Sequence, residues 1–211
     1  MSLKPLKRDE ILRRAQKAER RQNVRLKSPY RYIIFCEGEK TEPNYFGQIK
    51  ALIERKYRNA VFIEQHQQVD IEIIGTGRST FSLFDFARAY IADHETTYDY
   101  VWLIFDKDDF PQADFDNTIA RVKSLTEAAG PDDTRWFCGW SNQCIELWFV
   151  LHFEYYHVAH ERAHYIQKLN SIFSDKGIGR YKKNMPNIFN PTIPAQFIPT
   201  AINDHHLPFQ N

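Results

Sequence analysis

Short apolar runs alternate with longer segments of helical periodicity along this 211-residue chain. The strand-like runs span residues 30–36, 69–74, 99–105 and 134–140; the second of them alternates apolar residues with Asp70 and Glu72. The helical patterns span residues 41–57, 80–95, 114–129, 143–153 and 157–173. Continuous apolar runs of this length are typical of strands buried on both faces, and strands that alternate with helices build parallel sheets. The sequence therefore predicts an α/β fold with a Rossmann-like, mostly parallel sheet of about four strands and helices on both faces.

Composition indicates a packed protein in a reducing compartment. Hydrophobic residues make up 43% and aromatic residues 15% of the chain, which is enough for a substantial core. No apolar run approaches the ~20 residues that cross a bilayer, and the basic N-terminus lacks the apolar segment of a secretory signal. The three cysteines include no C-x-x-C pair, so we expect buried free thiols and no zinc-thiolate site. We predict a cytoplasmic protein that does not engage membranes.

Charge divides the chain into a basic arm and an acidic body. Residues 1–31 hold 11 Lys/Arg against 3 Asp/Glu, a net charge of +8, and the remaining residues hold 17 against 24, a net charge of −7. We predict a basic arm over 1–28, one domain over 29–185 and an irregular tail over 186–211, where prolines recur without a period. The arm either follows a phosphate backbone or is a solvated tail.

Two acidic clusters directly follow predicted strands. Glu37-Gly38-Glu39 comes after residues 32–36, and Asp106-Lys107-Asp108-Asp109 comes after residues 100–105. A parallel sheet presents its ligands at the carboxyl ends of its strands, where carboxylates from neighbouring strands can surround a hard divalent cation. We therefore predict that Glu37, Asp106 and Asp108 bind Mg²⁺ or Mn²⁺ and carry catalysis. The alternative is a solvated acidic loop.

Further candidates flank these clusters. Glu42 either stabilises a helix start or adds a ligand. Glu146 lies one turn into an apolar helix, where it is either exposed or requires a metal or lysine partner. Ser141 follows the fourth strand and can cap that helix. Lys40, Arg78 and Ser141 are candidate phosphate contacts, and the glycine-rich segment around Arg78 lacks the spacing of a P-loop.

His160-Glu161-Arg162-Ala163-His164 matches the H-E-x-x-H pattern of zinc proteases. On a helix, this spacing places two imidazoles on one face for Zn²⁺, and a third ligand is required. No Glu follows residue 161, and Gln167 and Asn170 replace the Gly and His of the extended motif. A zinc metalloprotease is thus a remote alternative to a polar helix face.

Several of these segments together resemble one protein family. Residues 35–46, with the sequence Phe-Cys-Glu-Gly-Glu-Lys-Thr-Glu-Pro-Asn-Tyr-Phe, resemble the opening motif of the RloB-like family. Residues 105–108 and 141–153 are similar to later blocks of that family, and the resemblance covers roughly residues 28–185. The resemblance does not extend past about residue 186, where the final helix of the family is not evident.

The resemblance implies a Toprim-like fold, because RloB-like proteins resemble the superfamily of primases, topoisomerases, small RNases and OLD nucleases. By that pattern, Glu37 is a general acid/base or metal ligand, and Asp106 and Asp108 bind Mg²⁺. The OLD nucleases add a Ser and a nearby Glu, here Ser141 and Glu146. The second Glu of their opening motif corresponds to Glu42.

The resemblance also implies a biological setting. RloB-like genes are associated with restriction or phage-resistance loci, often beside an SMC/ABC-like ATPase. We therefore expect a metal-dependent nuclease that cleaves DNA or RNA in anti-phage defence with an ATPase partner. A non-catalytic nucleic-acid-binding or regulatory subunit of a defence complex is the alternative.

Overall fold

The computed structural model describes residues 30–58, 69–94, 96–107, 111–130, 133–156 and 158–186. The predicted basic arm, the predicted tail beyond residue 186 and the predicted ligand Asp108 lie outside these ranges.

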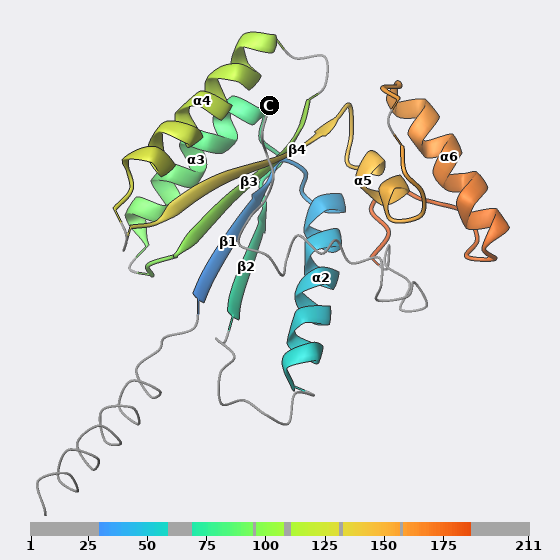
Figure 1. Cartoon of the computed structure of the whole chain (residues 1–211), viewed down its shortest axis with the longest axis horizontal. Helices are drawn as coiled ribbons and strands as arrows, with labels where there is room; N and C mark the ends of the chain where they lie inside the picture. Colours follow the sequence, from blue (N-terminus) through green and yellow to red (C-terminus); the bar gives the residue numbers. More distant parts are fainter. Residues whose placement is uncertain are drawn as a thin grey trace, which may run out of the picture.

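The strands form one all-parallel sheet in the order β2-β1-β3-β4 (Figure 1). The strands are β1 (Tyr30–Cys36), β2 (Val69–Gly75), β3 (Tyr100–Lys107) and β4 (Arg135–Asn142). The helices of the described ranges are α2 (Thr41–Arg58), α3 (Thr80–Asp93), α4 (Gln112–Ala128), α5 (Glu146–Leu151) and α6 (Arg162–Asp175). The predicted α/β fold is confirmed, and it is consistent with Rossmann-like and Toprim-like architectures.

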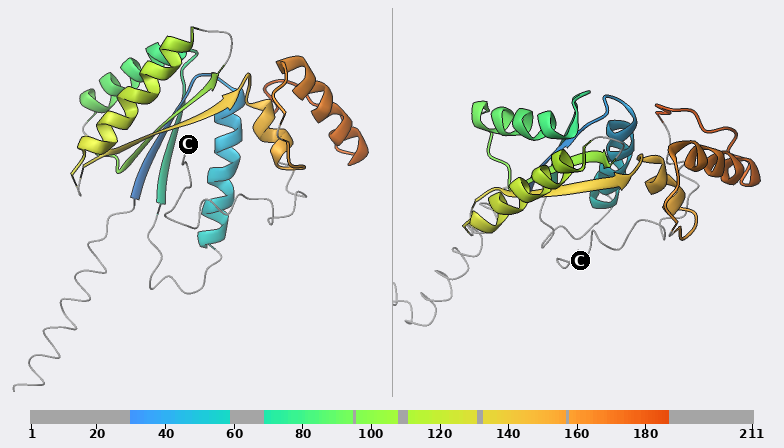
Figure 2. Two further views of the ribbon diagram at one scale, coloured as in Figure 1. Left: turned by 45° about the horizontal axis from the view of Figure 1, so that its top comes forward. Right: turned by 90° about the horizontal axis from the view of Figure 1, so that it is seen from above.

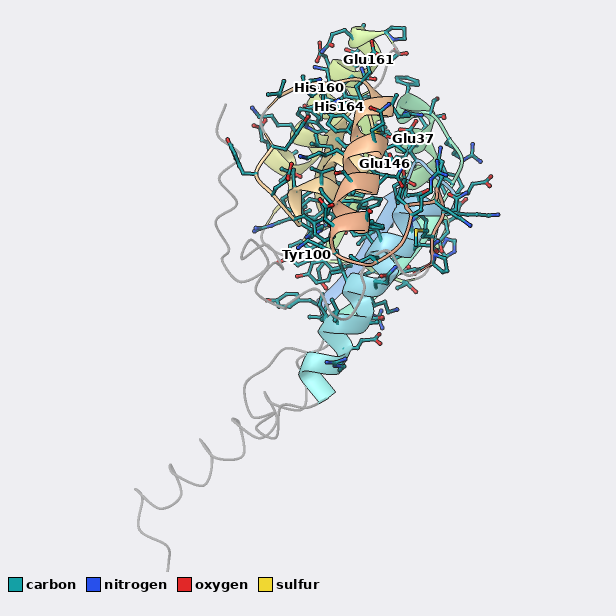
Figure 3. The ribbon with its side chains drawn as sticks, turned by 90° about the vertical axis from the view of Figure 1, so that its right-hand side faces the viewer. Glu37, Tyr100, Glu146, His160, Glu161 and His164 are labelled. Carbon is teal, nitrogen blue, oxygen red and sulfur yellow. The ribbon has the colours of Figure 1, made fainter. Side chains whose placement is uncertain are left out.

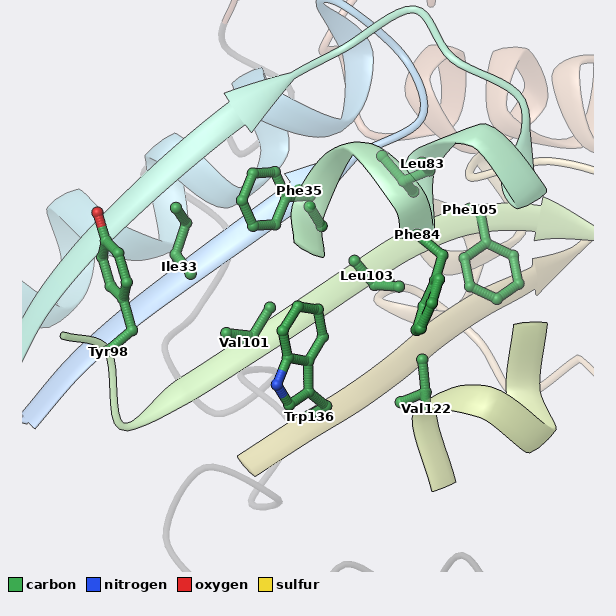
Figure 4. Packing of buried hydrophobic residues seen from close by; sticks show 11 residues of the cluster. Ile33, Phe35, Leu83, Phe84, Tyr98, Val101, Leu103, Phe105, Val122 and Trp136 are labelled. Atoms are coloured by element: carbon green, nitrogen blue, oxygen red, sulfur yellow. The ribbon is translucent and has the colours of Figure 1, made fainter. Parts of the chain in front are cut away.

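Helices cover both faces of the sheet, with α3 and α4 on one side and α2 on the other (Figures 1 and 2). The largest buried cluster lies between the sheet and the α3/α4 layer (Figure 4). Alternate residues of the strands meet apolar side chains of the two helices there, and the members include Ile33, Phe35, Leu83, Phe84, Val101, Leu103, Phe105, Val122 and Trp136. Each buried aliphatic or aromatic side chain contributes roughly 1.5–3 kcal/mol relative to exposure, so this layer holds the strand ends in place.

A second buried cluster joins α2 to α5 and α6 beyond the end of β4. Both of these later helices are shorter than the sequence predicts. Helix α5 begins at Glu146 because Gln143 adopts a positive φ of 67°, which no α-helix accommodates. Helix α6 begins at Arg162 because Glu161 is extended, with ψ 155°. No described helix is both long enough and apolar enough to cross a bilayer.

All three cysteines are free thiols, as the sequence predicts. Cys36 and Cys144 are buried, and Cys138 is half-buried. Burial raises the pKa of the Cys138 thiol to about 12, which makes it a poor nucleophile at neutral pH.

The strand order creates a switch point between β1 and β3. Strand β2 pairs with one edge of β1, and β3 pairs with the other edge, with Cys36 opposite Ile104. In open parallel sheets, ligands bind in the crevice beyond the carboxyl ends of the strands at such a point. Glu37 directly follows β1, and Asp106 is the second-last residue of β3. The fold therefore brings the first members of the two acidic clusters to this crevice.

Candidate active site

Glu37 and Asp106 meet at the switch point. The backbone N–H of Glu37 donates to the carbonyl of Ile104 at 2.8 Å, which extends the β1–β3 ladder by one residue. The Oε2 atom of Glu37 then lies 3.3 Å from the backbone nitrogen of Asp106 and 3.4 Å from the Oγ1 atom of Thr80, both of which donate to it. These bonds orient the Glu37 carboxylate toward the end of β3.

Ser141 and Arg162 hold the carboxylate of Asp106. Strand β4 continues to Asn142 and pairs Ser141 with Asp106, so the Ser141 hydroxyl donates to Asp106 Oδ1. The predicted capping role of Ser141 is therefore wrong, because Ser141 belongs to the strand. The Arg162 guanidinium donates to the carbonyl of Gln143 at 3.0 Å, and its Nη2 atom lies 3.9 Å from Asp106 Oδ2.

Burial raises the pKa of the Asp106 carboxyl to about 7. The hydrogen bond from Ser141 and the charge of Arg162 lower this pKa, whereas the charges of Glu42 and Glu37 raise it further. The charges of Glu42 and Glu37 thus affect this pKa more than the charge of Arg162 does. A divalent cation among these carboxylates would favour the ionised form, which is the electrostatic signature that a metal site requires.

A cavity of about 300 Å³ opens beside Asp106. It lies between the loop after β1, the start of α5 and the segments around Arg162 and Lys183. The side chains and backbone that line it belong to Gly38, Glu39, Lys40, Thr41, Glu42, Asp106, Cys144, Ile145, Glu146, Arg162, Lys183 and Asn184. The lining is strongly charged, so the cavity suits a polar ligand with bound cations or a phosphate group.

Glu42 is buried in this cavity and folds back over the loop after β1. A Cβ atom on Gly38 would lie 1.9 Å from Glu42 Oε2, so only glycine allows this conformation. Burial raises the pKa of Glu42, the charge of Glu146 raises it further, and Lys183 and Arg162 lower it. Glu42 is therefore a buried acidic group that shares the wall of this cavity with Asp106.

Glu146 is buried at the start of α5, with 3% of its surface exposed. The interpretation of an exposed glutamate is therefore wrong. The Tyr181 hydroxyl donates to Glu146 Oε1 at 2.8 Å and supplies a partner other than the expected lysine or metal. One carboxylate oxygen is thus held by the protein, and the residue lines the cavity.

Of the three predicted phosphate contacts, Ser141 donates its hydroxyl to Asp106, and the two charged side chains differ in position. Lys40 is exposed and lines the cavity. Arg78 is exposed and places its guanidinium 4.4 Å from the centroid of the Phe86 ring, and it lines neither of the two cavities described. The structure thus places Lys40 near the acidic cluster and directs Arg78 to a cation–π contact.

The H-E-x-x-H pattern does not form a helical zinc motif. His160 and Glu161 precede α6, so the spacing on which the motif depends is not helical. The rings of His160 and His164 instead stack with centroids 3.9 Å apart, and the Tyr156 hydroxyl lies 2.6 Å from His164 Nε2 (Figure 3). The zinc-protease hypothesis loses its geometric basis.

Within the residues that the structure describes, no three His, Cys, Asp or Glu side chains form a ready-made metal site. The chemistry of the available donors nevertheless fits a hard cation. Mg²⁺ keeps several waters and typically takes one or two protein carboxylates, and Glu37 and Asp106 supply these oxygens at adjacent strand ends. Asp108, the third predicted ligand, lies outside the described part of the chain.

Sequence reasoning missed several residues around the cavity. Arg162 and Lys183 line the cavity, and Tyr181 donates to Glu146 on its wall. All three come from segments more than 50 residues after Asp106, which the packing of α5 and α6 brings to the cavity. Their sequence neighbourhoods carry no motif for this site. Only the burial of Glu146, with its need for a donor, offered a signal that a partner such as Tyr181 exists.

A comparison with protein-family models shows to which family this chain belongs. The model for RloB-like protein matches residues 32–207, which is most of the chain. The chain belongs to the RloB-like family. The RloB-like match continues past residue 186, so the expected departure from the family there is wrong. No curated protein and no solved structure gives a significant match.

Proposed function

We propose that this RloB-like chain is a Mg²⁺- or Mn²⁺-dependent nuclease that hydrolyses phosphodiester bonds in DNA or RNA. The observation that carries the proposal is the meeting of Glu37 and Asp106 at the switch point, with Glu37 Oε2 3.3 Å from the Asp106 nitrogen. Carboxylates delivered together at strand ends are the donors that Mg²⁺ prefers. The charged cavity beside them has room for a phosphate group.

We assign each residue of the site a separate role in this reaction. Glu37, Asp106 and Asp108 would hold the cation, with Glu42 and Glu146 as additional carboxylates on the cavity wall. The bound ion supplies Lewis acidity and lowers the pKa of a bound water. Ser141 fixes one oxygen of Asp106 through its hydroxyl. Lys40 and Arg162 offer positive charge to the phosphate, where charge-assisted hydrogen bonds are strongest.

A cleavage assay tests the proposal. Labelled single-stranded and duplex DNA and RNA are incubated with Mn²⁺, with Mg²⁺ or with EDTA. We expect cleavage by the wild type with metal, none with EDTA, and a loss of at least ~100-fold in Asp106→Ala, because removal of a charge-stabilising group typically costs that much. Asp70→Ala is the matched control, because Asp70 is an exposed aspartate of β2. Equal activity of Asp106→Ala and the wild type would contradict the proposal.

A non-catalytic binding or regulatory subunit is the second candidate function. The observation in its favour is that the described residues contain no ready-made group of three metal-binding side chains. This hypothesis predicts that the wild type binds nucleic acid and that neither the wild type nor Asp106→Ala cleaves it with any metal. The same assay therefore separates the two functions.

We further propose that the chain acts in anti-phage defence with an SMC/ABC-like ATPase partner. Family resemblance supports this proposal. Co-expression with an ATPase encoded beside the gene should yield a complex that co-elutes and whose cleavage depends on ATP. Separate elution, together with cleavage that ATP does not change, would contradict the partnership and leave the nuclease proposal standing.

A further inference from the structure

A cluster of two aromatic rings and one ammonium group, in which Trp140 is exposed and the other two side chains are half-buried, stands at the strand ends near Asp106. It consists of Trp140, Phe115 and Lys107 and is called the aromatic platform below. The rings of Trp140 and Phe115 meet edge to face, with centroids 5.2 Å apart. The Nζ atom of Lys107 lies 5.0 Å from the Phe115 centroid and 5.8 Å from the Trp140 centroid. Trp140 keeps 43% of its surface exposed at the end of the edge strand β4.

The platform and the acidic cluster lie at the same ends of β3 and β4 but on opposite faces of the sheet, because successive strand residues point to opposite sides and Lys107 and Trp140 face Phe115 of α4. Lys107 directly follows Asp106, and Trp140 directly precedes Ser141, whose hydroxyl donates to Asp106. Asp106 also lines a second cavity, of about 130 Å³, together with Lys107 and Phe115. A ligand whose phosphate is held by a cation at Asp106 would therefore reach the platform through this second cavity.

A second aromatic–cation pair borders the same cavity. Phe81 lines it and keeps 42% of its surface exposed, and the Arg121 guanidinium lies 5.1 Å from the Phe81 centroid. The second cavity thus has an exposed aromatic side chain in its wall and Trp140 on the far side of Phe115. The lining of this cavity is mixed, with the aromatic rings of Phe81 and Phe115, the cation of Lys107 and the carboxyl groups of Asp106 and Asp114.

Exposed aromatic faces beside lysine or arginine are the elements with which proteins bind unpaired nucleotides. Bases stack on the rings and the cations contact the backbone, largely without sequence preference. A base inside a duplex is already stacked on its neighbours and cannot offer its face to a side chain. The chemistry of the platform therefore matches a single-stranded or looped nucleic acid better than a duplex.

We propose that the aromatic platform stacks an unpaired base next to the phosphate held at Asp106, so that this protein selects single-stranded or looped nucleic acid. The inference rests on the proposed nuclease function for the position of that phosphate. Trp140 supplies the main stacking face, because it is the most exposed ring of the cluster. Phe115 supports the indole from α4, and Lys107 neutralises the adjacent backbone.

The test measures binding without cleavage. Fluorescence anisotropy with Ca²⁺ in place of Mn²⁺, a hard cation that carboxylates bind, follows labelled single-stranded DNA and RNA, and the matching duplexes, with four proteins. These are the wild type, Trp140→Leu, Trp140→Phe and the control Tyr155→Leu. Leucine keeps an apolar contact with Phe115 and removes the flat ring, whereas phenylalanine keeps a ring. Tyr155 is an aromatic residue with 86% of its surface exposed and lines neither cavity described.

We expect the wild type to bind single strands more tightly than duplexes. Trp140→Leu should bind single strands roughly 5- to 100-fold more weakly, with duplex binding unchanged, because loss of one stacked base has that effect. Trp140→Phe and Tyr155→Leu should stay close to the wild type. Thermal unfolding confirms that each variant is folded, and Phe115→Leu repeats the test from the second ring should Trp140→Leu not fold.

Three outcomes would refute the proposal that the aromatic platform binds an unpaired base. They are single-strand binding that Trp140→Leu leaves unchanged, an equal loss for single strands and duplexes, and no binding of single strands by the wild type. Cleavage with Mn²⁺ is scored separately on the same proteins. A wild type that binds single strands through Trp140 but never cleaves refutes the nuclease proposal alone. A wild type that cleaves while Trp140→Leu binds normally refutes the platform alone.

Discussion

Replacing Asp106 by asparagine is expected to stabilise the metal-free protein above neutral pH. Asparagine keeps the size of the side chain and an oxygen that accepts the Ser141 hydroxyl, and it removes the charge. Burial, together with the charges of Glu42 and Glu37, raises the pKa of Asp106 from 3.8 to about 7. The wild-type carboxylate is therefore held in a place that disfavours its ionised form.

The sign of the effect follows from proton binding. Between about pH 4 and about pH 7 the native state holds the Asp106 proton and the unfolded chain releases it, so the free energy of unfolding falls as pH rises through this window. The pKa difference, about 7 minus 3.8, is about 3 units, and at 1.36 kcal/mol per unit this gives an upper bound of about 4 kcal/mol. Because the side chain remains 17% exposed, solvent screens part of this energy, and we expect about 2 kcal/mol.

The assay is urea unfolding in EDTA at about pH 4.5 and about pH 8, with wild type, Asp106→Asn and the exposed control Asp70→Asn. The stability gain of Asp106→Asn over wild type should grow by about 2 kcal/mol between the two pH values, whereas Asp70→Asn should show no comparable change. Other titrating groups cancel in this difference. A gain that is independent of pH, or a variant less stable than the wild type at the higher pH, would refute the electrostatic argument.

Three further substitutions test other parts of the structure. Gly38→Ala places a Cβ atom 1.9 Å from Glu42 Oε2 and should displace that flexible carboxylate. Mn²⁺-dependent cleavage should then fall, while the free energy of unfolding should change by less than about 1 kcal/mol. Tyr181→Phe leaves the buried Glu146 without its hydroxyl donor and should cost about 1–3 kcal/mol in urea unfolding. Phe35→Ala opens a cavity in the main core, where Phe35 is fully buried, and should cost about 3–5 kcal/mol in the same measurement.

Each of these expectations has a contrary result. Unchanged cleavage in Gly38→Ala would show that the position of Glu42 does not matter for activity. A Tyr181→Phe variant as stable as wild type would mean that Glu146 finds another donor. A small loss in Phe35→Ala, below about 1 kcal/mol, would contradict the placement of this ring at the centre of the core.

Periodicity alone was sufficient to predict the fold. The strands are covered on both faces, so β1 and β3 consist almost wholly of apolar residues and stand out from the helices between them. The same logic placed Glu37 and Asp106 at neighbouring strand ends, because parallel strands end at one edge of a sheet. The positions of these two residues could be predicted because the sequence pattern marks the strand ends and the parallel topology brings those ends together.

The remainder of the site depends on tertiary packing that no local pattern records. Ser141 was mistaken for a helix cap because the sequence does not show that β4 runs two residues beyond Trp140 to pair with β3. Arg162 was considered only as part of a histidine motif, yet its guanidinium lies 3.9 Å from Asp106 Oδ2. When a long side chain reaches a site from another element, the sequence around that residue carries no motif that identifies the site.

The same limit applies to buried charge. The sequence left Glu146 open between an exposed position and a buried one with a partner. Its donor, the Tyr181 hydroxyl, comes from a segment after α6 that lacks regular secondary structure. The packing of α5 against α6 determines which hydrogen-bond donor the buried Glu146 carboxylate receives. The periodicity of the sequence does not reveal this partner.

The most direct test of the metal site is anomalous scattering from crystals soaked in Mn²⁺. The account predicts a manganese peak at coordination distance, roughly 2 Å, from carboxylate oxygens of Glu37 and Asp106. The peak should be absent from crystals of Asp106→Asn soaked in the same way. A peak at His160 and His164 instead, or a site that Asp106→Asn occupies as fully as wild type, would contradict it.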